Sequence, residues 1–324
     1  MKSVIIAGGK GSRTGGLSQN EPKHILPVLN KPLIDYHIDN LSNHYPIRFA
    51  YSPNNKSFFD VYLTNRFPNL LDNGSLRPHN DTVLKGPLYP LFELLHDYKE
   101  EKQDILALTG DMFCNINIEE VIKFHKEQNW PMTLVATRTY PSPKACSFNV
   151  GGNGLLKGFR RLEGISGDKD LINLGLYVAN TDLLNIINLD LESYKEDVIF
   201  KKLIEEKALG VYVLEDNAVN INTPYNLLCA NLSQLDSNVF YGNNCNFLKK
   251  SNMTNVVVGN NTTIKEHCTL RNVVIMDDCI VESNSQLENV IIAKGTKVSA
   301  DTNLNNSIIY PNQLIEDMEI FYDF

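Results

Sequence analysis

Apolar and polar positions follow two different patterns along the chain. Up to about residue 230, short runs rich in β-branched residues predict strands at 3–7, 48–52, 104–111, 132–138, 174–180 and 209–216. Between them, apolar residues recur at helical spacing and predict helices at 32–42, 90–101, 118–128 and 197–208. Strands that alternate with helices predict an α/β domain with a mostly parallel sheet. A ligand site is then expected beyond the carboxyl ends of the strands.

From about residue 238 helical periodicity gives way to a repeat of 17 residues. Asparagine recurs at Asn238, Asn255, Asn272, Asn289 and Asn306. Three apolar columns recur in step, and they are Tyr241, Val258, Ile275, Ile292 and Ile309; Phe247, Ile264, Val281, Val298 and Ile315; and Met253, Leu270, Leu287, Leu304 and Phe321. Segments of six, six and five residues, each opening on one apolar side chain, predict a three-sided parallel β-helix with one coil per repeat. The asparagine column predicts a stacked amide ladder at a corner. The alternative is a loop-rich all-β tail, in which four columns would share the same spacing only by chance.

Composition narrows the class of protein. The 324 residues are expected to form a domain at 1–232 and a β-helix at 233–324. A net charge of −8 argues against a broad basic surface for nucleic acid, so any anion site is local. The six cysteines show no C-x-x-C spacing, which predicts neither a zinc site nor a disulfide framework. The sequence has no signal-peptide pattern and no membrane-spanning apolar run, so we expect a cytoplasmic protein without a membrane partner.

The first predicted strand leads into a glycine-rich loop that carries cationic side chains. Glycines at 8, 9 and 11 would let backbone N–H groups approach a phosphate closely. A P-loop would need Ser or Thr after Lys10, but Gly11 follows it. A dinucleotide fingerprint would need a third glycine at Thr14 and a helix after it, which Gly15 and Gly16 disfavour. The loop therefore predicts an anion site of another kind.

Residues 8–34, GGKGSRTGGLSQNEPKHILPVLNKPLI, resemble the signature of the sugar-1-phosphate nucleotidylyltransferases. The matching positions are Gly8, Gly9, Gly11, Ser12, Arg13, Pro22, Lys23, Leu26, Pro27, Val28, Lys31 and Pro32. Gly16-Leu17-Ser18 departs from the Pro-Leu-Thr of that family. Several branches of the family append a left-handed β-helix, so the resemblance covers both halves. It implies a Rossmann-like nucleotidyltransferase domain followed by a left-handed β-helix, in an enzyme that joins a nucleoside triphosphate to a sugar-1-phosphate and releases pyrophosphate.

Such a transfer depends on charge neutralisation and in-line positioning, without a protein nucleophile. Arg13 is expected to hold the departing phosphates as a fork of donors, although it could also be a solvated loop arginine. Lys23, which follows the rigid Pro22, is expected to place its charge between the α-phosphate and the attacking anion. The expected nucleotide contacts are Ala7, Gly8, Gly9, Gly11, Ser12, Gly86 and Asp111.

The family also binds Mg²⁺, and two positions match its ligands. Asp111 ends an apolar strand in Gly-Asp, where the family has its magnesium-binding aspartate; a turn or helix-cap aspartate is the structural alternative. AVNINTPYNLLCAN (218–231) keeps the frame of the family's Asp-Ile-Gly-Thr-Pro segment but reads Asn220-Ile-Asn222-Thr-Pro. An asparagine oxygen can still ligate Mg²⁺, with less charge than a carboxylate. The resemblance thus implies Asp111 and Asn220 as metal ligands.

The sugar-binding positions depart furthest from the family. Arg160-Arg161 stands where the family has Glu-Lys, so Arg161 is expected to grip the sugar phosphate while an acceptor for sugar hydroxyls is lost; a solvated basic turn is the alternative. Asn173 and Gly175 are expected beside the sugar. The Gly-Pro-Leu at 86–88 is similar to that of the mannose-1-phosphate guanylyltransferase branch, which favours GTP and leaves CTP, UTP and dTTP open.

Two alternative functions and a homo-oligomeric assembly are also compatible with the sequence. Asn220, Asn222 and Arg160 would also suit a catalytically silent paralogue that binds a nucleotide-sugar and regulates a partner. The same chemistry would also suit a cytidylyltransferase for a non-sugar phosphate. The seven histidines form no ligand cluster, and His267 alone lies in the predicted coils, which argues against an acetyltransferase half. The coils are expected to serve structure or assembly, in a homo-oligomer.

Overall fold

The computed structural model describes residues 1–9, 11, 13–18, 21–83, 85–138, 145–164, 166–167, 170–215, 218–248, 250–310 and the backbone of 319–320. The chain forms two compact units that interleave along the sequence. The first comprises Met1–Lys10 and Ile34–Asn220, and the second comprises Gly11–Leu33 and Ile221–Phe324. The glycine-rich loop therefore leaves the first unit at Lys10 and enters the second at Gly11. The domain boundary expected between residues 232 and 233 stays a prediction.

A nine-stranded mixed sheet forms the centre of the first unit. Its strands are β1 (Lys2–Ile6), β4 (Ile47–Tyr51), β5 (Leu76–Asn80), β6 (Ile105–Thr109), β8 (Met132–Thr137), β9 (Cys146–Val150), β10 (Leu156–Arg161), β11 (Ile172–Ala179) and β12 (Leu209–Leu214). The main order is β10-β9-β11-β6-β1-β4-β5, and β8 pairs with both β11 and β12. Strands β6, β1, β4 and β5 run parallel, as does the pair β8 and β12. Strand β11 is antiparallel to β6, β8 and β9, and β10 is antiparallel to β9. The Rossmann-like α/β class is confirmed, with β10 and β11 running opposite to the other strands of the sheet.

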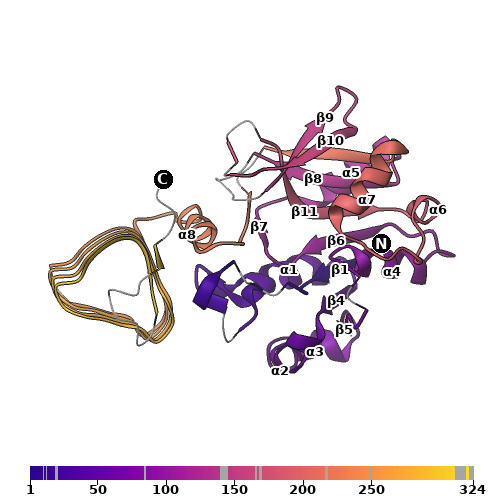
Figure 1. Cartoon of the computed structure of the whole chain (residues 1–324). Coiled ribbons are helices and arrows are strands. Elements are labelled where there is room, and N and C mark those ends of the chain that lie inside the picture. The colour runs from indigo at the N-terminus through magenta and orange to yellow at the C-terminus, as the bar shows by residue number, and fades with distance from the viewer. Residues whose placement is uncertain are drawn as a thin grey trace. The chain divides into compact units, whose positions relative to one another are not determined.

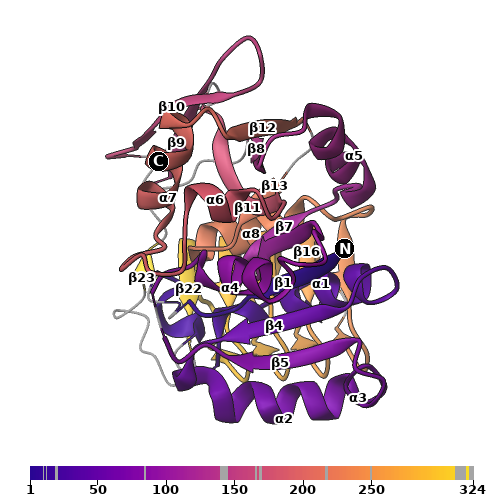
Figure 2. The ribbon, with the colours of Figure 1, turned by 90° about the vertical axis from the view of Figure 1, so that its right-hand side faces the viewer.

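Helices cover the sheet and confirm the four expected from helical spacing. The helices of this part are α1 (Leu33–Ser42), α2 (Lys56–Arg66), α3 (Pro68–Asp72), α4 (Tyr89–Asp97), α5 (Ile118–Gln128), α6 (Leu183–Ile186) and α7 (Glu196–Glu205), with a short 3₁₀ turn η3 (Pro53–Asn55). Helix α2, which lies along β5 in Figure 2, was not expected from the sequence because it buries only Phe59 and Leu63. Phe59 packs on Phe49 of β4 with ring centroids 5.0 Å apart. None of the helices in the described ranges has the length and apolar character needed to cross a bilayer.

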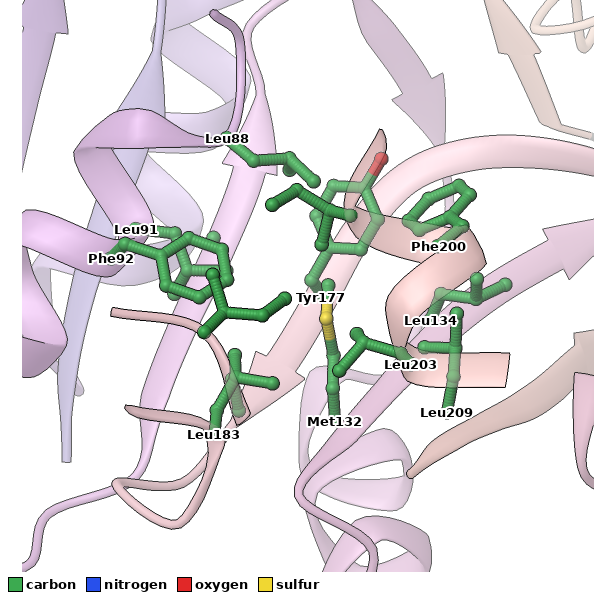
Figure 3. Close-up of a cluster of buried hydrophobic side chains, with 14 of the residues drawn as sticks. Leu88, Leu91, Phe92, Met132, Leu134, Tyr177, Leu183, Phe200, Leu203 and Leu209 are labelled. Carbon is green, nitrogen blue, oxygen red and sulfur yellow. The ribbon is translucent and has the colours of Figure 1, made fainter. Parts of the chain in front are cut away.

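The main core lies between the sheet and helices α4 and α7 (Figure 3). Tyr177 of β11 stands at its centre, fully buried, next to Met132 of β8 and Phe200 of α7. In Figure 3 the hydroxyl of Tyr177 lies at one end of the cluster, away from Met132. The tyrosine ring thus belongs to the core while its oxygen is available to polar groups at the edge of the sheet.

The second unit contains the expected parallel β-helix. Its strands are β14 (Val239–Tyr241), β15 (Asn246–Phe247), β16 (Asn252–Val258), β17 (Thr263–Ile264), β18 (Thr269–Ile275), β19 (Ile280–Val281), β20 (Gln286–Ile292), β21 (Lys297–Val298) and β22 (Asn303–Ile309), with β23 (Glu319–Ile320) antiparallel to β22. Thr269 pairs with Asn252 on one side and Gln286 on the other, a separation of one repeat each way. Figure 1 looks along the coils, which trace a triangle. The 17-residue period read from the sequence is confirmed.

The asparagine ladder is also confirmed, from Asn255 onward. Asn255, Asn272, Asn289 and Asn306 have φ between 52° and 54°, a left-handed conformation that asparagine tolerates. The side-chain nitrogen of each donates to the side-chain oxygen of the next, at 3.0, 2.9 and 3.0 Å. The left-handed residue lets the chain turn the corner, and the amide joins one coil to the next.

The other two corners explain two of the cysteines. His267 and Asp278 have positive φ, and each is followed by a buried cysteine. Cys268 Sγ donates to the carbonyl of Glu282 at 3.2 Å, and Cys279 Sγ donates to that of Ala293 at 3.2 Å. Burial raises the pKa of the Cys279 thiol to about 11. These cysteines act as small core residues that bind a carbonyl of the next coil, and His267 is a corner residue.

The apolar columns fill the inside of the coils and the helix α8 covers one outside face. Val258 and its column mates to Ile309 are buried, whereas Tyr241 of the first coil is 61% exposed; Ile315 and Phe321 lie outside the described residues. An outward row is buried as well, and it consists of Val257, Val274, Ile291 and Ile308. Helix α8 (Pro224–Leu232) packs on β16, β18 and β20 along this row. Burial of the row removes apolar area from water and fixes α8 to the coils.

The later part of the glycine-loop signature folds against α8. Strands β2 (Pro27–Val28) and β3 (Lys31–Pro32) form a hairpin after the short 3₁₀ turns η1 (Gly15–Ser18) and η2 (Lys23–Ile25). Asn231 of α8 accepts from the Leu29 N–H at 2.9 Å and donates to the Pro27 carbonyl at 3.0 Å. Asn30 Nδ2 donates to the carbonyl of Val258 at 2.8 Å. These bonds make the signature residues 11–33 part of the second unit.

Candidate functional site

The carboxyl edge of the first unit's sheet gathers several of the expected residues. β1 ends at Ile6, and the next amide, that of Ala7, donates to the Ala50 carbonyl at 2.7 Å. β6 ends at Thr109, just before Asp111. Because β11 runs antiparallel to β6, its beginning, with Asn173 and Gly175, lies at this same edge. The reversed strand thus brings Asn173 and Gly175 to the end of β6 that Asp111 follows.

Three glycines of the expected site differ in what surrounds them. A Cβ on Gly175 would lie 2.2 Å from Thr109 Oγ1, and one on Gly86 would lie 2.6 Å from the Tyr194 carbonyl carbon. Both also have positive φ, so the backbone conformation and the close contacts require glycine there without any ligand. A Cβ on Gly8 would meet only the Ser52 amide nitrogen, at 4.0 Å. Packing among the described residues therefore does not require glycine at position 8.

Glu196 also lies at this edge, although no motif in the sequence marks it. It opens helix α7, and its Oε1 accepts from Asn173 Nδ2 at 2.9 Å and from the Tyr177 hydroxyl at 2.7 Å. Asn173 Nδ2 also lies 2.8 Å from the Tyr177 oxygen, and Asn173 Oδ1 accepts from the Gly175 N–H at 3.1 Å. The sequence signal was an acidic first turn, which is also the signature of an ordinary helix start.

The charges of two other expected residues, Asp111 and Arg161, affect the pKa of Glu196. Burial raises the pKa of the Glu196 carboxyl, and the negative charge of Asp111 raises it further, while Arg161 acts in the opposite direction. Burial also raises the pKa of Tyr177, and the negative charge of Asp111 adds to this effect. Glu196 is therefore coupled electrostatically to Asp111 and to Arg161, which all lie in the first unit. One carboxylate oxygen of Glu196 is held by two donors, which orients the other.

Asn220 provides the observation that bears on a metal ion. The strand β13 (Ala218–Asn220) pairs with β7 (Met112–Cys114), so that Asn220 lies opposite Met112, the neighbour of Asp111. Its Nδ2 donates to the Asn173 carbonyl at 2.9 Å, whereas its buried Oδ1 has no hydrogen-bond partner within the described chain. A buried carbonyl oxygen without a partner is unfavourable unless a ligand satisfies it. Across the described residues, no three His, Cys, Asp or Glu side chains form a metal site by themselves.

Arg160 and Arg161 diverge on β10. Arg160 donates to Asp170 Oδ1 at 3.1 Å, and the same oxygen accepts from the Ser147 hydroxyl at 2.7 Å. Arg161 is exposed and is felt electrostatically by Glu196. Arg160 is therefore engaged by Asp170, whereas Arg161 is the arginine of the pair whose charge lowers the pKa of Glu196.

The two expected cationic residues lie in the second unit and share one partner. Arg13 Nη2 donates to Asn222 Oδ1 at 3.1 Å, and Lys23 Nζ donates to the same oxygen at 3.0 Å. Lys23 is buried and Arg13 is exposed. The loop between them is held by Thr14 Oγ1 and Ser18 Oγ, which both donate to the Gly11 carbonyl, at 2.6 and 3.0 Å. Ser12 falls outside the described residues.

The departure at Gly16 has a packing explanation. A Cβ on Gly16 would lie 2.9 Å from two ring carbons of Tyr310, which follows the last coil strand β22. Where the family signature has proline, this chain has the one residue without a side chain. Any side chain at position 16 would meet the ring of Tyr310, so the residue that follows β22 packs on the loop that carries Arg13.

Two family profiles match the chain. The profile described as nucleotidyl transferase matches residues 2–219, and the profile described as GMPPB C-terminal domain matches residues 230–320. A putative mannose-1-phosphate guanyltransferase of Sulfolobus acidocaldarius is 25% identical over 244 residues, which cover 72% of this chain and 63% of that protein. The mannose-1-phosphate guanylyltransferase catalytic subunit beta of Xenopus tropicalis is 25% identical over 243 residues, covering 73% of this chain and 65% of that protein. The chain thus spans less than two thirds of the length of these relatives.

Proposed function

The chain belongs to the nucleotidyl transferase family, and we propose that it joins a nucleoside triphosphate to a sugar-1-phosphate, giving a nucleotide-sugar and pyrophosphate. The relatives are named for mannose-1-phosphate and a guanylyl group, so GTP and mannose-1-phosphate are the proposed pair. The observation that carries the proposal is the cluster of Asp111, Asn173, Glu196 and Asn220 at the carboxyl edge of the sheet. Polar groups of this kind at this edge suit a phosphorylated ligand and its hydroxyl groups.

In this proposal the phosphates are held by backbone and by cationic side chains. Ala7, whose amide is bonded to the Ala50 carbonyl, leads into the loop, and Gly8, Gly9, Gly11 and Ser12 offer their amides to the triphosphate. Arg13 holds the departing phosphates, and Lys23 holds the α-phosphate toward the attacking anion. No covalent intermediate is needed, because positioning and charge neutralisation suffice for in-line transfer. Gly86 keeps its proposed place near the nucleotide.

A divalent cation, Mg²⁺ in the proposal, fits the residues present. The carboxylate of Asp111 and the unpartnered Oδ1 of Asn220 would hold it, and both are oxygen donors of the kind Mg²⁺ prefers. When bound, such an ion neutralises charge on the reacting phosphates. Asn220 keeps its own orientation through the bond of its Nδ2 to the Asn173 carbonyl. Asn220 of this chain therefore presents an oriented amide oxygen where the nucleotidylyltransferase pattern has a carboxylate.

The sugar would be bound by Arg161, Asn173, Gly175 and Glu196. Arg161 would hold the sugar phosphate, and Glu196 would accept from sugar hydroxyls in place of the acceptor lost at Arg160. Replacing Glu196 by glutamine removes the charge and keeps the shape. We expect KM for the sugar phosphate to rise about tenfold, with a smaller change in KM for the triphosphate. Steady-state kinetics against each substrate measures both, with Glu192→Gln, an exposed position on the same stretch, as the control. Equal effects on both substrates would contradict a role in sugar binding.

A screen of pyrophosphate release tests the function itself. GTP, CTP, UTP, dTTP and ATP are each paired with mannose-1-phosphate, other sugar-1-phosphates and phosphocholine, in the presence of Mg²⁺. We expect release with GTP and mannose-1-phosphate, together with a new nucleotide-sugar in the product analysis. Turnover with CTP and phosphocholine would favour the cytidylyltransferase reading. Absence of turnover with every pair, alongside tight binding of a nucleotide-sugar, would replace the proposal by the regulatory paralogue.

The alternative of a catalytically silent paralogue has one structural observation in its favour, since Asn222 accepts a hydrogen bond from both Arg13 and Lys23. The expected homo-oligomer and the expected cytoplasmic location stay predictions. Size-exclusion chromatography with light scattering measures the first directly.

A further inference from the structure

We propose that Asn222 is a positioning residue that holds Arg13 and Lys23 together for a polyphosphate. The inference rests on the proposed function, because it gives these two cations a phosphate ligand. Where the family segment has glycine, this chain has a side chain that reaches both. Asn222 thus supplies an acceptor that a glycine at this position would lack.

The geometry is that of one acceptor with two charged donors. Asn222 Oδ1 lies 3.1 Å from Arg13 Nη2 and 3.0 Å from Lys23 Nζ, so the two cationic nitrogens are no more than about 6 Å apart. Two positive charges at this distance repel each other, and an amide oxygen with two lone pairs can accept from both. Asn222 therefore holds the pair at short separation before any anion is bound.

The backbone on either side of Asn222 is anchored. Ile221 and Thr223 are buried, and Thr223 Oγ1 accepts from the Asn226 N–H at 3.1 Å as the N-cap of α8. A guanidinium has five N–H donors and an ammonium three, and the amide oxygen accepts one from each. In the proposal, phosphate oxygens approach both cations while Asn222 remains in place. A neutral acceptor suits this role because it leaves the positive charge for the phosphates.

The test uses the full chain and inorganic tripolyphosphate as the probe, titrated by calorimetry without added metal. In Asn222→Gly the two cations separate, and we expect binding to weaken about fivefold. In Asn222→Asp a carboxylate neutralises both cations and competes with the probe, and we expect a loss of more than about tenfold. The control is Asn129→Gly, at an asparagine of the first unit whose positive φ glycine tolerates. Thermal melting of each variant shows whether the fold is kept.

Each outcome decides the proposal. If Asn222→Gly binds tripolyphosphate as tightly as the parent or more tightly, Asn222 is not a positioning residue, and tighter binding would make it an obstruction. If Asn222→Asp binds as well as the parent, the neutral charge of the amide has no role. Binding of the probe is read independently of turnover. An inactive parent whose probe binding still depends on Asn222 would overturn the proposed function alone, whereas an active parent with indifferent variants would overturn this inference alone.

Discussion

The Asp111→Asn variant is expected to lose about 10²–10³-fold in pyrophosphate release under saturating substrates and Mg²⁺. The substitution keeps the shape of the side chain and removes the negative charge that a divalent cation would need beside Asn220. It also removes the repulsion that raises the pKa of Glu196, so the fold should be kept. Coupled detection of pyrophosphate measures the rate, and circular dichroism checks the fold.

The matched control is Asp182→Asn, an exposed aspartate at the start of α6 in the same unit. It carries the same chemical change away from the carboxyl edge and should leave the rate within about twofold. A folded Asp111→Asn variant that kept more than a tenth of the parent activity would remove Asp111 from the catalytic set. A second titration with Mg²⁺ separates weaker ion binding from a slower step at saturation.

The second large effect concerns stability and pH. His37 of α1 is buried, its Nε2 has no hydrogen-bond partner within the described chain, and burial lowers its pKa to about 4. The folded protein therefore keeps this ring neutral at pH values where the unfolded chain, with a pKa near 6.5, takes up a proton. Stability falls as the pH is lowered through this window. From pH 7 to pH 4 the loss from this group is about 3 kcal/mol in the free energy of unfolding.

Urea unfolding followed by the fluorescence of Trp130, at several pH values between 7 and 4, measures this loss. In His37→Gln the ring is absent, and the pH dependence should become flatter by about that amount. His125, whose pKa is also lowered by burial, leaves a residual slope in both proteins. His44→Gln, at an exposed position, serves as the control and should leave the slope unchanged. Parallel curves for parent and His37→Gln would show that another group carries the acid sensitivity.

The coils were readable from the sequence because their signal is repeated. Each of the columns that begin at Tyr241, Phe247 and Met253 recurs at the same spacing, so errors at one coil are corrected by the next. The sheet of the first unit was readable where strands are apolar on both faces, as in β6 and β8. The antiparallel direction of β11 was not readable, since it depends on pairing with strands far along the chain. Helix α2 and strand β5 were missed because few of their residues are buried.

The site was only partly readable for a related reason. Asp111, Asn173 and Asn220 could be found because a family pattern surrounds them, and the structure brings these three to one edge. Glu196 has no such pattern, and its place beside Asn173 follows from the packing of α7 on the sheet. The role of Asn222 was equally hidden, because its partner Arg13 lies 209 positions away in the sequence. Chemistry that depends on contacts between distant segments requires the fold.

The corner columns of the β-helix have a consequence for how its length can change. Every strand pair in the coils, as between Thr269 and Gln286, joins positions one whole repeat apart. Loss or duplication of one complete coil would leave each amide stack and each inner row continuous. A change of a single residue would instead rotate the remaining corners onto flat faces and place β-branched side chains in left-handed backbone. The β-helix can therefore lengthen or shorten only by whole coils, so the number of coils sets its length.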